Sequence, residues 1–250
     1  MDVELQKADF WKRLAAWLLD FMLACILVIG IGTLLSWAFD YDGTLDKYES
    51  MYNGYIQQYD LEDVDISNPA SLTEEQQVRY DQAAIAMNSD TELLRLRELI
   101  PNLMLLFVTV SLMVTVLLLE FAVPMLMKNG RTVGKRVFGL GVVRVDGVQI
   151  SGFQMFVRTA VGKFAIELMV PIYAILYFGL ASLAGMILVG GIFLAQVICL
   201  FATKTNSALH DQLAASVVVD LNSQRVFKNP TELIEYTKRI HAEKAKNADY

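Results

Sequence analysis

Cysteine and histidine are scarce in this chain, with two of each in 250 residues. Cys25 and Cys199 lie in apolar runs, where a free thiol behaves as a small hydrophobic side chain, so no disulfide framework is expected. With only His241 as a second histidine, His210 cannot belong to a histidine metal cluster. We therefore expect no metal site, no redox chemistry and no cofactor.

Charged side chains are nearly absent from three long stretches, although the chain as a whole carries a net charge of −6. The composition is 55% hydrophobic, and the apolar residues come in long runs, which is typical of membrane proteins and argues against a soluble enzyme. The first run is too long for the apolar region of a signal peptide, and no cleavage site is evident. We interpret it as a true spanning helix.

The runs divide the chain into six regions. The third apolar run is about 60 Å long as one helix, twice the thickness of the hydrocarbon core, so the small residues Gly179–Gly185 are expected to split it into two spans. A re-entrant hairpin there is the alternative. The predicted fold is an all-α polytopic membrane protein with four transmembrane helices: 1–39 (N-terminus and first span), 40–98 (outer loop), 99–127 (second span), 128–163 (basic loop), 164–203 (third and fourth spans) and 204–250 (tail).

The distribution of charge predicts the orientation. Lys7, Lys12 and Arg13 precede the first span, whereas residues 40–92 are rich in Asp and Glu and contain only Lys47 and Arg79 as basic residues. Positively charged loops stay on the cytoplasmic side, so both termini and the basic loop are expected in the cytoplasm.

The outer loop is expected to form two amphipathic helices, over 44–60 and 73–99, broken at Ser67-Asn-Pro69. Tyr48, Tyr52, Tyr55 and Tyr59 recur at helical spacing in this loop. We favour packing of these tyrosines between the loop helices or at the lipid headgroups. The alternative is a docking surface for an envelope protein.

Inside the cell, Val142–Ile150 alternates around Asp146-Gly147, a strong signal for a β-hairpin. Residues 215–221 could add a third strand. The last segment, 230–249, is expected to be a solvated helix.

Three carboxylates are expected at membrane depth: Asp20, Glu120 and Glu167. Counted from the nearest cation, they lie about 10, 12 and 6 Å deep, all in the cytoplasmic leaflet. Glu120 and Glu167 each precede a proline by four residues, which leaves the glutamate carbonyl without its helical partner. The three carboxylates are candidates for a proton or small-cation site, with Arg13, Arg158 and Lys163 as counter-charges. The alternative is an ion-pair network that only holds the helices together.

The segment from Gly130 to Arg136 contains glycines and basic residues, but its spacing does not fit a phosphate loop. A tight turn is expected, with anionic lipid bound by Lys128, Arg131, Lys135 and Arg136. A membrane protease needs a second intramembrane aspartate beside Asp20, and none is evident, so no enzyme activity is expected. No nucleic-acid partner is expected either. His210 and Asp211 are interpreted as a structural hydrogen-bonded pair.

Three stretches resemble the RDD family of bacterial membrane proteins. They are Arg13-x-x-Ala16-x-x-x-Asp20, the segment from Gly130 to Gly147, and the segment from Leu209 to Val218, together with Arg158. In the second stretch the matching residues include Gly130, Thr132, Gly134, Lys135, Arg136, Gly139, Asp146 and Gly147. By similarity, Arg13 is the family arginine, Asp20 the first aspartate and Asp211 the second. Ser216 stands where the family usually has Thr, and the outer loop is unusually large.

The resemblance implies a protein of the bacterial cytoplasmic membrane and a small-cation or proton transporter or antiporter. A homo-oligomer is expected, since four helices make a thin wall for a pathway. The alternative is a non-transporting accessory subunit that docks a partner through residues 40–98.

Overall fold

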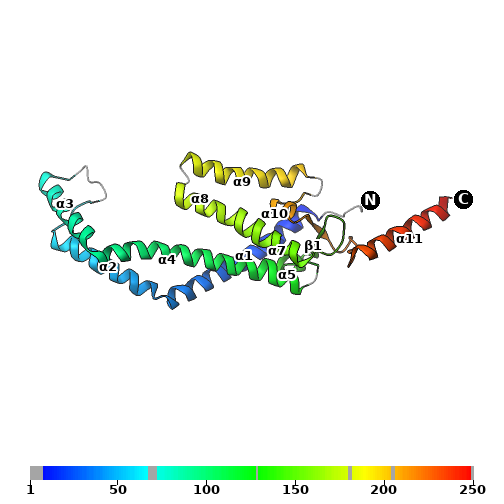
Figure 1. Cartoon of the computed structure of the whole chain (residues 1–250), viewed down its shortest axis with the longest axis horizontal. Helices are drawn as coiled ribbons and strands as arrows, with labels where there is room; N and C mark the ends of the chain where they lie inside the picture. Colours follow the sequence, from blue (N-terminus) through cyan, green and yellow to red (C-terminus); the bar gives the residue numbers. More distant parts are fainter. Residues whose placement is uncertain (1–7, 67–71, 128, 180–181, 204–205, 249–250) are drawn as a thin grey trace. The chain divides into compact units, whose positions relative to one another are not determined.

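The computed structural model describes residues 8–66, 72–127, 129–179, 182–203 and 206–248, and these are mostly helical (Figure 1). Four of the helical stretches are long and apolar enough to cross a membrane: Phe10–Ala38, Thr91–Leu126, Gly152–Phe178 and Leu183–Ala202. The four predicted membrane helices are thereby confirmed as candidate spans. Their surfaces carry many exposed large apolar side chains, as expected for contact with lipid.

The chain forms two compact units, residues 29–111 and residues 1–28 with 112–250. The helices α1 (Phe10–Ala38) and α4 (Thr91–Val116) run through both. The first of these units also contains α2 (Tyr41–Gln58) and α3 (Glu74–Ser89), which lie within the loop predicted over 40–98. A capping box between Thr73 and Gln76 fixes the start of α3, as the sequence predicts.

The second loop helix ends earlier than expected. Asp90 stops α3, and its side chain accepts hydrogen bonds from the backbone N–H groups of Glu92 and Leu93 at the start of α4. From there α4 continues through Pro101 without a break, so the boundary predicted at residue 98 lies inside a helix. The expected break at Ser67–Pro69 falls outside the described residues.

The loop tyrosines are half-buried within this unit. The rings of Tyr48 and Tyr52 stack with centroids 6.1 Å apart, and the Tyr55 hydroxyl donates to Asp90 across 2.9 Å. That bond raises the pKa of Tyr55 and, with the backbone bond from Leu93, lowers the pKa of Asp90. The stack lies within α2, whereas the bond from Tyr55 to Asp90 joins α2 to the end of α3 and agrees with packing between the loop helices.

A two-stranded antiparallel sheet lies in the other unit. Strand β1 (Leu140–Arg144) pairs with β2 (Ser216–Asp220), with Val142 opposite Val218. The predicted turn at Asp146-Gly147 is present, and the Arg144 N–H donates to the Val148 carbonyl at 2.9 Å, but its second arm contributes isolated bridges, Val143 to Gln149 and Val148 to Phe227, rather than a strand. The strand predicted over 215–221 is the partner of β1, and four of its five side chains are buried.

The third and fourth spans begin and end differently from the expectation. The third starts at α7 (Gly152–Phe156), continues as the π-helical segment η3 (Val157–Met169) and ends as α8 (Val170–Phe178). Arg158 and Lys163, expected in the basic loop, therefore belong to the spanning helix. The fourth span is α9 (Leu183–Ala202), which lies beside α8 and returns antiparallel to it (Figure 1).

The remaining helices are short except for the last. η2 (Leu117–Ala122) and α5 (Val123–Leu126) extend α4, and α6 (Val133–Val137) and α10 (Leu209–Leu213) precede the two strands. The tail ends in α11 (Pro230–Ala248), close to the predicted 230–249. A buried apolar cluster that includes Ala16, Val142, Met155 and Val218 packs α1, α7 and the sheet together.

Candidate functional site

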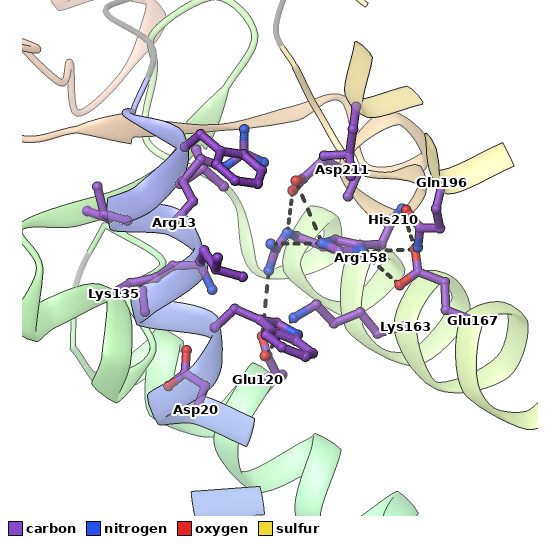
Figure 2. Close-up of a pocket in the computed structure, with 18 residues that line it drawn as sticks. Arg13, Asp20, Glu120, Lys135, Arg158, Lys163, Glu167, Gln196, His210 and Asp211 are labelled. Carbon is purple, nitrogen blue, oxygen red and sulfur yellow. Dashed lines mark hydrogen bonds and ion pairs between the residues drawn. The ribbon is translucent and has the colours of Figure 1, made fainter. Parts of the chain in front are cut away.

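A cavity of about 310 Å³ lies among the ends of the spanning helices and the short elements α6, α10 and β2. All four candidate spans contribute a polar side chain to its lining: Asp20 from α1, Glu120 from η2, Arg158 from η3 and Gln196 from α9. Figure 2 shows the labelled side chains converging from these elements. The lining contains four cations and four carboxylates in addition to His210: Arg13, Lys135, Arg158 and Lys163; Asp20, Glu120, Glu167 and Asp211.

Asp20 lies on α1, is buried and contacts the start of α6. Its Oδ2 accepts a hydrogen bond from the Thr132 hydroxyl at 2.5 Å, and its Oδ1 accepts from the Gly134 backbone N–H at 2.7 Å. Thr132 also caps α6 by accepting from the Lys135 backbone N–H. The carboxylate is thus compensated by two donors of the motif from Gly130 to Arg136 rather than by a cation.

Arg13 lies on the same helix but does not pair with Asp20. Its guanidinium donates to the backbone carbonyl of Asn206 across 2.6 Å. Arg13, expected as a counter-charge, thus has a backbone carbonyl as its partner, and it lines the cavity. Spacing along one helix gave both residues the same face but could not locate the carbonyl that Arg13 contacts.

Gly134 permits the approach of α6 to α1. A Cβ atom at this position would lie 2.1 Å from the backbone oxygen of Ala16 and 3.0 Å from the carboxyl carbon of Asp20. Since the nearer atom is backbone, no side-chain movement could relieve the clash. The glycine is therefore required for the bond from its own N–H to Asp20.

Glu120, in η2, contacts two cations of η3. Lys163 lies 2.6 Å from its Oε1, and Arg158 lies 3.8 Å from its Oε2. The backbone carbonyl of Glu120, expected to be left free by Pro124, accepts a hydrogen bond from the Thr159 hydroxyl at 2.9 Å. The prediction of a free carbonyl beside this carboxylate is accordingly wrong, because a neighbouring span supplies the missing donor.

Arg158 and Asp211 form a fully buried ion pair, and each side chain is 1% exposed. The Arg158 Nε donates to Asp211 Oδ1 across 2.7 Å, and the Ser216 hydroxyl donates to the same oxygen at 3.0 Å. Burial alone would raise the pKa of Asp211, but the Arg158 guanidinium and His210 hold it well below its usual range. The second aspartate of the resemblance is thus held as an anion by the third span.

Glu167 contacts His210 rather than a lysine. The His210 backbone N–H donates to Glu167 Oε1 at 2.9 Å, and the imidazole Nδ1 lies 2.9 Å from both carboxylate oxygens. Burial lowers the pKa of His210 despite its carboxylate neighbours. The predicted pairing of His210 with Asp211 is secondary, because that distance is 3.6 Å.

Lys135 points into the cavity rather than toward lipid (Figure 2). Its side chain is buried, and its Nζ lies 3.3 Å from the Thr132 hydroxyl. Burial lowers the pKa of Lys135 to about 8, although Glu120 acts in the opposite direction. The prediction that Lys135 binds anionic lipid is wrong for this reason, whereas Arg136 is exposed and Lys128 lies outside the described residues.

Other motif residues shape the backbone around the cavity. Gly130, Gly139 and Gly147 adopt φ of 59°, 70° and 83°, a region that favours glycine. Asp146 pairs with Arg144 at 2.8 Å and accepts from the Val148 N–H, which fixes the turn. These positions form the scaffold of β1 and do not line the cavity.

Two cavity residues or supports, Thr159 and Gln196, were not predicted, and Ser216 was noted only as a departure from the family pattern. Gln196 accepts a hydrogen bond from the Leu209 backbone N–H at 3.0 Å and ties α9 to α10. A glutamine in an otherwise apolar span is a signal that the sequence did contain. Thr159 carried no such signal, since hydroxyls are common in spanning helices, and Ser216 lies on β2, where its contact with Asp211 depends on the tertiary packing.

Comparison with known proteins gives one result. A family model described as the RDD family matches residues 7–215, which include every residue that lines the cavity except Val218. No curated protein and no solved structure matches the chain. Because the match covers most of the sequence and contains the charged residues described above, the chain belongs to the RDD family.

Proposed function

We propose that this membrane protein exchanges protons for a small monovalent cation through the cavity. The observation that supports this proposal is that all four candidate spans place a polar side chain in one cavity. Ionisable groups at membrane depth are costly and usually mark ion or proton pathways. Polar sites where spanning helices depart from regular α geometry are typical of transporters, and η2 and η3 have such geometry.

The cavity contains groups that can carry protons. Asp20, Glu120 and Glu167 are carboxylates, and His210 contacts Glu167 directly. The four cations and four carboxylates that line the cavity give it zero net charge when His210 is neutral. Gain or loss of a single charge therefore leaves the cavity with a net charge. A neutral cavity that gains one cation would have to release one proton to stay neutral.

The proposal includes an orientation and a location. The basic residues of 128–163 and the acidic loop over 40–92 favour cytoplasmic termini in the bacterial inner membrane. Exposed Arg136 is available to anionic lipid, and homo-oligomers would enclose a longer pathway than four helices alone. A non-transporting accessory role through residues 40–98 is the competing proposal.

The test is flux in liposomes. The purified full chain is reconstituted with an internal pH-sensitive dye, and sodium, potassium and proton gradients are imposed in turn. We expect proton movement driven by a cation gradient, reduced by Glu120→Gln and Glu167→Gln and unchanged by Glu75→Gln, an exposed residue of α3. No proton movement from folded wild-type protein under any gradient would refute transport and leave the accessory role.

A further inference from the structure

The four cations of the cavity differ in how their charge is compensated. Arg158 contacts Asp211 at 2.7 Å, and Lys163 contacts Glu120 at 2.6 Å. Arg13 donates to a backbone carbonyl. In the part of the chain that the structure describes, Lys135 has no carboxylate within 4.0 Å, and its Nζ contacts the Thr132 hydroxyl at 3.3 Å.

The charged groups that face Lys135 come from three of the candidate spans. They are Asp20 on α1, Glu120 on η2, and Arg158 and Lys163 on η3. Asp20 already accepts from Thr132 and Gly134, and Glu120 already contacts Lys163. The carboxylates nearest to Lys135 are therefore engaged elsewhere, while two cations repel its charge.

Lys135 is also the cation whose chemistry allows it to lose a proton here. Arginine stays protonated in proteins, which excludes Arg13 and Arg158. Lys163 lies 2.6 Å from the Glu120 carboxylate, so its charge has a direct partner. A buried lysine without such a partner is the group that deprotonates most readily.

We infer that Lys135 is a further proton-binding group of the cavity and that it is the one that releases its proton when a monovalent cation enters. Release leaves three cations and four carboxylates in the lining, a deficit that one monovalent cation fills. Departure of the cation restores the proton to the Lys135 amine, so one proton moves for each cation. This inference rests on the proposed exchange function and names the residue that couples the two ions.

The first measurement is the titration of Lys135 itself. Full-length protein in nanodiscs is labelled with ¹³Cε-lysine, and the Lys135 signal is assigned by its loss in Lys135→Arg. We expect a midpoint near the pKa of about 8 and a lower midpoint when sodium or potassium replaces a large organic cation at constant ionic strength. A midpoint near the ordinary 10.5, or one that neither cation changes, overturns the inference.

The second measurement is exchange in liposomes. Lys135→Arg keeps the charge but cannot release it, and Lys135→Met removes it, so both are expected to slow cation-driven proton movement more than about tenfold. Lys238→Arg, on the exposed face of α11, is the matched lysine control and should behave as wild type. Wild-type exchange in folded Lys135→Arg overturns the inference while the transport proposal stands.

The two measurements separate the two proposals. A cation-sensitive titration of Lys135 in a protein that moves no protons refutes the transport function but supports Lys135 as the group that exchanges its proton for a bound cation. Transport that neither Lys135 variant affects supports the transport function but refutes the role of Lys135.

Discussion

The Nε atom of Arg158 in the third span donates to Oδ1 of Asp211 on α10 across 2.7 Å, and both side chains are 1% exposed. Removal of one partner leaves the other as a buried unpaired charge, which costs about 3–5 kcal/mol. Asp211→Asn is therefore expected to lower the free energy of unfolding by about 3 kcal/mol or more, measured by thermal unfolding in detergent. The apolar pair Arg158→Met with Asp211→Leu should recover much of that loss.

The control for this prediction is Asp146→Asn, which breaks the ion pair to Arg144 in a turn where both side chains are more than one-third exposed. Such surface pairs contribute about 1 kcal/mol or less. Equal losses from the two asparagine variants would contradict a special role for the buried pair.

Gly134 should tolerate no side chain. Gly134→Ala places a Cβ 2.1 Å from the Ala16 carbonyl oxygen, so α6 must move away from α1 and Asp20 loses its backbone donor. We expect a loss of about 3 kcal/mol or more in unfolding free energy, or no folded protein in size-exclusion chromatography. Gly54→Ala in α2 is the matched control, because nothing lies within 4 Å and the change should stabilise the helix by about 0.5–1 kcal/mol. A folded Gly134→Ala with wild-type stability would show that the helices can separate freely.

The stability of the protein should depend on both carboxylate oxygens of Asp20. Asp20→Asn keeps one carbonyl oxygen, so either the Thr132 hydroxyl or the Gly134 N–H meets an amide NH₂ instead of an acceptor. We expect a loss of about 1–3 kcal/mol in thermal unfolding, whereas the exposed Asp46→Asn on α2 should change stability little. An Asp20→Asn variant as stable as Asp46→Asn would contradict this account of Asp20.

Lys135 should make stability depend on pH. Burial lowers its pKa to about 8 from 10.5, so between these values the unfolded chain binds more protons than the folded protein. The free energy of unfolding must then rise with pH across this interval, by up to about 3 kcal/mol. The measurement is the difference in unfolding free energy between wild type and Lys135→Met at several pH values. A difference that stays constant from pH 8 to 10.5 would show that Lys135 does not titrate there.

The sequence by itself determined the membrane class, the four spans and the family. Long apolar runs leave little choice but helices in lipid, because each backbone group must be satisfied within its own segment. The same reasoning marked Asp20, Glu120 and Glu167 as costly, and each does line the cavity. The helical period placed these carboxylates in one leaflet but could not say which donor meets each one.

Only the tertiary structure decided the partners. Asp20 is compensated by Thr132 and Gly134, more than a hundred residues later, and Arg158 by Asp211 on a different element. The same long-range packing pairs β1 with β2 instead of with the nearer hairpin strand, and turns Lys135 from the expected lipid surface into the cavity. Spacing along one helix fixes depth and face, whereas the identity of a buried charge's partner depends on which segments pack against it, and that is a property of the whole fold.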